Sequence, residues 1–363
     1  MKILYDHQIF SLQKYGGISR YFANLFKGIN NSGKGYGYIT SLFSKNEYVK
    51  NEPLALNNPV GHKLFKNKPN RMYNWNRRFS RWSLRLRNFD VFHPTYYDPY
   101  FIKFLRKPCV ITVHDMVHEL YPAYFPDAEE VTLRKKRVME RANLLIAISE
   151  FTRLDIIKVY PYMQDKIRVV YHGYLGLTDQ AEKNDSLPAK YILFVGERWH
   201  YKNFQVFLEG ISSLLQNDAD LLLMCAGGKA FTADELALFE QYKIAGQCQQ
   251  MDVTDVTLKQ LYSQAQLFVF PSLHEGFGFP LLEAFANQCP VICSDSSCLP
   301  EIAGNAALYF DPHKPDHILQ ITTRVLEDEL LREELKKKGL ERLELFTFDA
   351  CVQNTLQVYQ SLY

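Results

Sequence analysis

Residues 271–284 read Pro-Ser-Leu-His-Glu-Gly-Phe-Gly-Phe-Pro-Leu-Leu-Glu-Ala, and this stretch decides the type of fold. An apolar strand ends at Pro271, a glycine-rich turn follows, and Pro280 marks the start of a helix, because proline is favoured at the first helical positions. Backbone N–H groups and the positive end of the helix dipole then favour an anion in the turn. The stretch therefore predicts a strand–turn–helix unit with a phosphate site.

Two carboxylates belong to the same unit. Glu275 lies in the turn and Glu283 in the first turns of the helix. Carboxylates fit poorly beside bare phosphate and well beside hydroxyl groups, so the combination indicates a phosphorylated polyol such as a nucleotide sugar. Stabilisation of the helix dipole explains Glu283 about equally well, whereas it explains Glu275 less well.

Short apolar strands alternate with helical segments along the whole chain. Uninterrupted apolar strands separated by helices indicate βαβ units around buried parallel sheets, so the fold class is α/β, doubly wound in each half. The expected strands are residues 2–5, 36–43, 90–93, 109–114, 144–149, 166–171, 191–196, 221–226, 249–253, 267–271, 290–293 and 307–310.

The length of 363 residues favours two domains, because a single core stops growing near ~250–300 residues. The polar segment 173–190 is the natural linker, which predicts domains at 1–173 and 174–347 and a final helical segment at 348–363. Charge divides in the same way. Residues 1–175 carry 28 Lys or Arg against 14 Asp or Glu, whereas residues 176–363 carry 14 against 26.

The basic excess peaks between Lys63 and Arg87. Trp75, Phe79 and Trp82 lie in this segment at helical spacings of four and three. Such a composition suits the surface of an anionic membrane, and it equally suits a solvated basic helix that packs its aromatic side chains on its own domain. The cations, which no acidic residue interrupts, are Lys63, Lys66, Lys68, Arg71, Arg77, Arg78, Arg81, Arg85 and Arg87.

Polar and glycine-rich residues follow the strands, where parallel sheets bind ligands. Arg198 and Lys202 come directly after a strand, and an Arg–Lys pair in that position suits a diphosphate better than it suits a solvated surface. Other strand ends carry Gly16-Gly17, His114-Asp115 and His172-Gly173.

Several other classes of protein are disfavoured. The turn Gly276-x-Gly278 lacks the third glycine of a dinucleotide fingerprint, and the chain has neither a Walker A sequence nor a Gly-x-Ser-x-Gly elbow. Asp218-Ala219-Asp220 precedes its strand and so lies at the wrong edge for a catalytic metal, and we expect none. The seven cysteines form no Cys-x-x-Cys pair and are expected to be buried free thiols. With no membrane-length apolar run and no secretory signal, we expect a cytoplasmic protein.

Taken together, these motifs resemble the Glu-x7-Glu signature of retaining glycosyltransferases of family 4, of the type that builds bacterial surface polysaccharides. The resemblance extends from Gly16–Arg20 through His114-Asp115 and Arg198 to Leu299-Pro300-Glu301. It implies the GT-B architecture, in which two Rossmann-like domains face a cleft. The C-terminal domain would bind the nucleotide sugar, and the segment 348–363 would pack back onto the N-terminal domain.

Carried over position by position, the resemblance implies a catalytic set and a donor-binding set. Glu275 would contact donor-sugar hydroxyls, Arg198 and Lys202 the diphosphate, and His114 the region between sugar and acceptor. Glu283 would hold the ribose hydroxyls. The glycines and the neighbouring aromatic residue that would line the sugar and diphosphate are Gly16, Gly17, Gly276, Phe277 and Gly278. Two departures, His172 in place of an asparagine and Met251 in place of a glycine, weaken any assignment of the base.

The implied reaction is retaining, metal-independent transfer of a hexose from a nucleotide-diphosphate sugar, with no cofactor. The acceptor would be a glycan or a lipid-linked glycan, the enzyme would lie in the cytoplasm or against the inner face of the membrane, and no nucleic acid would bind. Two alternatives are a nucleotide-sugar epimerase of the same fold and a non-enzymatic membrane or nucleic-acid binder. The second leaves Glu275 and Glu283 unexplained.

Overall fold

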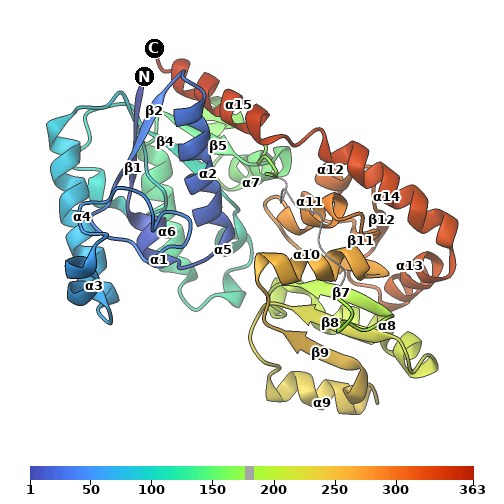
Figure 1. Ribbon diagram of the computed structural model, residues 1–363. Coiled ribbons are helices and arrows are strands. Elements are labelled where there is room, and N and C mark those ends of the chain that lie inside the picture. The colour runs from blue at the N-terminus through green and yellow to red at the C-terminus, as the bar shows by residue number, and fades with distance from the viewer. Residues whose placement is uncertain (176–183) are drawn as a thin grey trace. The chain divides into compact units, whose positions relative to one another are not determined.

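The computed structural model describes residues 1–175 and 184–363, and the chain divides into two compact units (Figure 1). Unit 1 comprises Met1–Gly173 and Phe348–Tyr363, and unit 2 comprises Tyr174–Thr347. The expected linker 173–190 lies partly outside the described residues.

Unit 1 is built on two three-stranded parallel sheets with strand orders β2-β1-β3 and β4-β5-β6. An isolated parallel bridge between Phe92 and Cys109 joins β3 to β4. The strands are β1 (Lys2–Asp6), β2 (Tyr36–Thr40), β3 (Val91–His93), β4 (Val110–Val113), β5 (Leu144–Ala147) and β6 (Ile167–Val169).

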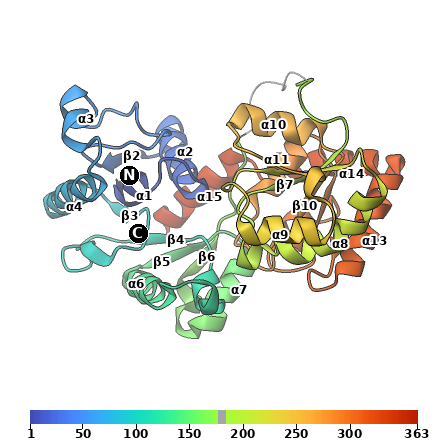
Figure 2. The same cartoon turned by 90° about the horizontal axis from the view of Figure 1, so that it is seen from below.

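Helices cover both faces of these sheets (Figure 2). Alternating side chains of β1 face opposite ways: Tyr5 packs in the core beneath α2 and α15, and Leu4 packs in the core beneath α4, α6 and α7. The helices are α1 (Gln8–Leu12), α2 (Gly17–Asn31), α3 (Pro59–Phe65), α4 (Pro69–Leu86), η1 (Pro99–Phe101), α5 (Val117–Leu120), η2 (Pro122–Tyr124), α6 (Ala128–Arg141), α7 (Glu150–Val159), η3 (Pro161–Lys166) and α15 (Phe348–Gln360).

The C-terminal helix α15 is part of the core of unit 1. Gly28 of α2 makes this packing possible, because a Cβ there would lie 2.6 Å from Cγ2 of Val352. A buried hydrogen bond of 3.0 Å joins the Tyr5 and Tyr359 hydroxyls, and Tyr359 also bonds to Nδ1 of His93 at 2.6 Å. The final segment therefore packs on the N-terminal unit, as the family resemblance implies.

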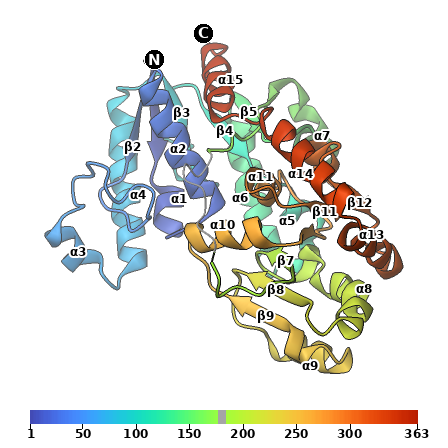
Figure 3. The ribbon, with the colours of Figure 1, turned by 45° about the vertical axis from the view of Figure 1, so that its right-hand side comes forward.

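Unit 2 has one six-stranded parallel sheet in the order β12-β11-β10-β7-β8-β9. Around it, α8 packs against α13, and α11 against α14 (Figure 3). The strands are β7 (Tyr191–Val195), β8 (Leu222–Ala226), β9 (Cys248–Met251), β10 (Leu267–Phe270), β11 (Val291–Ser294) and β12 (Leu308–Phe310). The helices are η4 (His200–Lys202), α8 (Phe204–Asn217), α9 (Ala233–Gln241), η5 (Ala245–Gln247), α10 (Asp255–Gln264), α11 (Phe279–Ala286), α12 (Leu299–Ala303), α13 (Pro315–Glu327) and α14 (Glu329–Leu343).

The sheet of unit 2 reverses its strand order between β7 and β10, which are neighbours. In open parallel sheets, such a switch point is where loops diverge and leave room for a ligand beyond the carboxyl ends of the strands. The segments after these two strands contain Arg198, Lys202 and Glu275. The topology therefore places these three predicted residues at the edge where a ligand is expected.

The α/β fold class is confirmed, and a strand occurs at each expected position with slightly different bounds. All seven cysteines are free and buried, as expected. Within residues 1–175 and 184–363, none of the helices combines the length and the apolar character that crossing a membrane requires.

Candidate active site

Lys202 and Glu275 form an ion pair at the switch point of unit 2. The Lys202 Nζ lies 2.6 Å from Oε1 of Glu275, and both side chains are mostly buried. Two bonds hold the loops in place: Leu273 N–H donates to the Tyr201 carbonyl at 2.7 Å, and Glu275 N–H donates to Oγ of Ser297 at 3.2 Å. An ammonium group and a carboxylate are thus fixed together, where they can hold a phosphate and a sugar hydroxyl side by side.

Arg198 is nearly buried, with a side chain 5% exposed. Its Nε donates to Oε1 of Glu235 at 2.7 Å, its Nη2 donates to the Lys229 carbonyl at 2.6 Å, and the guanidinium lies over the Phe231 ring. The Nη1 atom is buried, and none of the described residues accepts a hydrogen bond from it. The guanidinium is therefore fixed by its own unit and keeps one donor for an anion.

A glycine is required beside this guanidinium. Gly228 has φ +68°, and a Cβ there would lie 2.9 Å from Nη1 of Arg198 and 3.1 Å from the Gly196 carbonyl oxygen. The left-handed conformation strains any larger residue at this position, and a Cβ there would push the Arg198 guanidinium aside. The loop after β8 thus supports Arg198.

The predicted glycine turn leads into α11. Gly278 precedes the helix with φ +94°, Pro280 lies in its first turn, and no described side chain caps the helix. Phe277 is buried against Phe346, with ring centroids 5.7 Å apart. Gly276 is buried in the same turn, so the backbone of residues 276–278 is held close to the switch point.

Glu283 lies on α11 and is half-buried. The Tyr262 hydroxyl of α10 donates to Oε2 of Glu283 at 3.3 Å, and burial, together with the Glu283 charge, raises the pKa of Tyr262 well above its usual range. Tyr262 therefore stays a neutral donor that fixes the carboxylate. Nothing in the sequence links Tyr262 to Glu283, because the two residues lie on different helices.

His114 follows β4 in unit 1 and is packed among aromatic rings. Its ring stacks on His172 at 5.8 Å between centroids, and the Tyr21 ring meets both imidazoles edge-on. The His114 backbone N–H donates to the Tyr97 hydroxyl at 3.2 Å, and its Nε2 atom is buried without a hydrogen-bond partner among the described residues. Burial lowers the pKa of His114 to about 4, so the imidazole is neutral near pH 7.

Behind His114, a buried ion pair fixes the loop. The Lys135 Nζ lies 3.1 Å from Oε2 of Glu119 and also donates to the Asp115 carbonyl. The charge of Lys135 also lowers the pKa of the Asp115 carboxyl, against the opposing effect of burial. Lys135 and Glu119 therefore position Asp115, the residue next to His114.

Four buried histidines predict how stability depends on pH. Burial lowers the pKa of His7 and His93 to about 3, that of His114 to about 4, and that of His172 well below its usual value. Below the usual pKa of ~6.5 the unfolded chain binds more protons than the folded chain, so the free energy of unfolding decreases as the pH falls, by about 1.4 kcal/mol per pH unit for each histidine. We expect the urea midpoint to drop clearly between pH 7 and pH 5. Equal midpoints would contradict neutral buried histidines.

Gly16 and Gly17 begin α2 in unit 1. The Gln13 side chain takes the place of a helix cap, because its Oε1 accepts from the Ser19 N–H at 3.3 Å, and the Ser19 hydroxyl donates to the Gly16 carbonyl at 3.0 Å. Gly17 is exposed. His114, Gly16 and Gly17 thus belong to unit 1, and every other predicted site residue belongs to unit 2.

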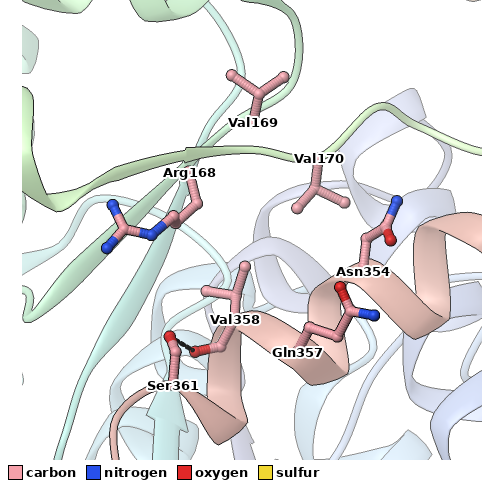
Figure 4. A pocket seen from close by; sticks show the side chains of 7 residues that line it. All are labelled: Arg168, Val169, Val170, Asn354, Gln357, Val358 and Ser361. Carbon is pink, nitrogen blue, oxygen red and sulfur yellow. Dashed lines mark hydrogen bonds between the residues drawn. The ribbon is translucent and has the colours of Figure 1, made fainter.

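A further cavity in unit 1 is lined by none of the predicted site residues. This cavity of about 420 Å³ lies between β6 and α15, with Arg168 on the strand, Asn354 and Gln357 on the helix and Ser361 just after it (Figure 4). Among the described residues, no group of three or more His, Cys, Asp or Glu side chains is arranged to hold a metal ion.

Two family models match the chain, one for each unit. Residues 15–174 match the model described as Glycosyltransferase Family 4, and residues 178–342 match the one described as Glycosyl transferases group 1. The chain is a GT-B glycosyltransferase of the family 4 type. The enzyme class and the architecture that the resemblance implied are thereby confirmed.

Curated relatives of this glycosyltransferase include O-antigen enzymes. The chain is 29% identical over 299 residues to O-antigen chain mannosyltransferase B of Escherichia coli, an alignment that spans 77% of each chain. It is 30% identical over 226 residues to O-antigen chain mannosyltransferase RfbU of Salmonella typhimurium, spanning 58% of this chain and 63% of the relative.

Solved structures share the fold at low identity. A sucrose-phosphate synthase of Thermosynechococcus elongatus matches with a TM-score of 0.73 and 18% identity, covering 100% of this chain and 99% of that one. HepE of Anabaena, solved in complex with UDP and glucose, matches with a TM-score of 0.72 and 14% identity over the same shares of both chains. These likenesses concern the fold alone.

Proposed function

We propose that this glycosyltransferase moves a hexose, with retention of configuration, from a nucleotide-diphosphate sugar to a glycan or lipid-linked glycan. The observation that carries the proposal is the Lys202–Glu275 ion pair at the β7–β10 switch point. Its ammonium suits the diphosphate and its carboxylate suits hydroxyls of the sugar. The α11 turn, with Gly276–Gly278, adds backbone donors.

The chemistry follows from where charge develops. Breaking the bond between the anomeric carbon and the phosphate oxygen leaves both electrons on the diphosphate, and Lys202 with Nη1 of Arg198 would stabilise that charge. The acceptor oxygen then bonds to the anomeric carbon from the same face, and its proton passes to the departing phosphate oxygen. No protein nucleophile is assigned. Neutral His114 would accept or donate a hydrogen bond through Nε2 near the sugar.

Mannose is the hexose that the relatives favour, since both the Escherichia coli and the Salmonella typhimurium proteins are named as mannosyltransferases of the O-antigen. Thermal unfolding with a panel of nucleotide-diphosphate sugars tests the donor, because at equal concentration the ligand that binds the folded state most tightly stabilises it most. The expected result is a raised Tm with a nucleotide-diphosphate mannose and sugar transfer to an added glycan. Interconversion of the sugar without transfer would instead favour an epimerase.

Metal independence is a separate expectation. Cations supplied by Lys202 and Arg198 take the place that a metal holds at the leaving diphosphate, so the rate of transfer should be unchanged in EDTA. The check is an initial-rate assay with and without chelator after dialysis. Activity that is lost in EDTA and restored by magnesium or manganese would overturn this part of the proposal.

A membrane surface is the proposed location of the acceptor. On α4, the face packed into unit 1 consists of Met72, Asn76, Ser80 and Leu84 rather than the aromatic residues. Trp75, Trp82 and Leu86 remain 37%, 54% and 57% exposed, and Phe79 stacks on Trp82. An exposed apolar stripe flanked by cations favours the membrane interpretation over packing of the aromatic residues on their own unit.

We expect the wild-type protein to sediment with anionic liposomes at low salt and to be released from them at high salt, because salt screens the attraction between the cations and the lipids. Changing Lys68 and Arg78 to Glu should weaken binding strongly, and Trp82→Ser should weaken it at every salt concentration. Arg77 is unsuitable for this test, because it forms an ion pair with Asp98. If the wild-type protein does not sediment with anionic liposomes, a membrane role for α4 is wrong.

A further inference from the structure

A basic pocket lies in unit 1, outside the donor-binding residues. Its volume is about 330 Å³, and its lining comes from the segment after α1, the connection between β2 and α3, and α3 itself. The lining residues are Lys14, Ser44, Lys45, Glu47, Lys50, Asn51 and His62. Three lysines face a single glutamate, which leaves the pocket positively charged.

The wall of this pocket is a long connection without regular structure that is nonetheless rigidly held. Buried Asn76 of α4 accepts from the Leu42 and Phe43 N–H groups at 2.9 and 3.2 Å and donates to the Phe43 carbonyl at 2.8 Å. Ser44, also buried, donates to the Phe10 carbonyl at 2.7 Å. Connections of this length without helix or strand are uncommon in compact domains unless they have a function.

The same wall is bonded to the loop that precedes Gly16. The Asn46 side chain donates to the Gln13 carbonyl at 2.9 Å, and the Glu47 N–H donates to the Lys14 carbonyl at 3.0 Å. Asn46 is fully buried. The pocket is therefore built onto the glycine loop of the predicted active site.

Charge in the pocket is only partly neutralised. Glu47 pairs with Lys50 and, at 3.9 Å, with Lys14, while the Lys45 ammonium donates to the Lys66 carbonyl, which carries no charge. The Lys50 hydrogen bond lowers the pKa of Glu47, so this carboxylate is ionised near pH 7 and neutralises one lysine at most. Lysines around a cavity are point charges that suit phosphate groups.

The pocket also adjoins the exposed aromatic stripe. The His62 ring meets the Phe43 ring edge-on at 5.0 Å between centroids, Phe43 contacts Phe65 at 5.3 Å, and Phe65 contacts Trp75 of α4 at 5.8 Å. These ring contacts pass through the buried Phe43 and Phe65, and they link the pocket to Trp75 on the helix proposed to face the membrane. A ligand with a phosphate head and an apolar chain would match the pocket and the exposed ring of Trp75.

We propose that this pocket binds the phosphate or diphosphate group of a lipid-linked acceptor, with the lipid directed toward α4. The proposal rests on the proposed function, because it names the acceptor class of that reaction. Free inorganic phosphate has the same head-group chemistry, so the experiment must separate the two sources.

The test measures binding of farnesyl diphosphate, farnesol and inorganic diphosphate, with a nucleoside diphosphate present to fill the donor site. Wild type should bind farnesyl diphosphate more tightly than either of the other two. Lys14→Glu with Lys45→Glu should weaken farnesyl diphosphate binding at least tenfold. Lys103→Glu, an exposed lysine of the same unit outside the pocket, should leave it unchanged.

The outcomes separate the pocket from the donor site. Equal binding of inorganic and farnesyl diphosphate would mean a free-phosphate site and overturn the lipid-linked acceptor. If wild type and the double variant bind farnesyl diphosphate equally well, the pocket is not the binding site. In both cases a nucleotide sugar would still raise the Tm of the wild-type protein. If no nucleotide sugar raises the Tm of wild type, the proposed function itself is wrong.

Discussion

Replacing Lys202 by alanine is expected to lower turnover by about 10²–10³, the usual loss when a preorganised donor at a developing oxyanion is removed. The Lys202 ammonium is fixed 2.6 Å from Oε1 of Glu275 at the end of β7, so it needs no reorganisation as charge builds on the diphosphate. The measurement is kcat for transfer from the nucleotide sugar identified by thermal unfolding. Glu275→Gln should lower turnover too, because a neutral amide holds the ammonium less firmly.

Lys190 supplies the matched control. It forms an ion pair with Asp218 beside the opposite end of β7, and both side chains are about one-third exposed. Exposed pairs of this kind contribute little to stability, so Lys190→Ala should keep wild-type turnover and nearly wild-type stability. If Lys202→Ala binds donor and turns over like Lys190→Ala, Lys202 has no part in catalysis.

Strands and the positions of the site residues could be predicted because the signals are local. The run at residues 267–271 is apolar throughout, and such a run fits a strand that is buried on both faces of a parallel sheet. Glycines and charges follow it directly, and parallel topology places strand ends at one edge. The run at residues 191–196 is a second such strand, and Arg198 and Lys202 follow it, so they were predicted at the same edge of the sheet.

Partners of those residues could not be predicted, because they come from distant parts of the chain. Glu235 reaches Arg198 from the start of α9, where it also forms a capping box with Thr232. The basic pocket was missed for a related reason. Asn46 and Asn76 resemble ordinary polar residues in the sequence, and only the fold shows that they are buried and pin the loop.

Arg198→Ala should reduce turnover by about 10²–10³ and also destabilise unit 2. The guanidinium is nearly buried against Glu235, and removing one partner of a buried pair typically destabilises a protein by about 3–5 kcal/mol, because the other charge is left uncompensated. Arg198→Lys should recover part of the stability and little of the turnover. A lysine has no planar fork to bond Glu235, the Lys229 carbonyl and the donor at once.

A double variant separates the two effects of Arg198. In Arg198→Met with Glu235→Gln no buried charge is left unpaired, so the urea midpoint should return most of the way to wild type while turnover stays low. Catalysis restored along with stability would mean that Arg198 acts only by holding the loops after β7 and β8. Persistent loss of turnover in a stable double variant requires a role at the diphosphate, where Nη1 has no partner in the described chain.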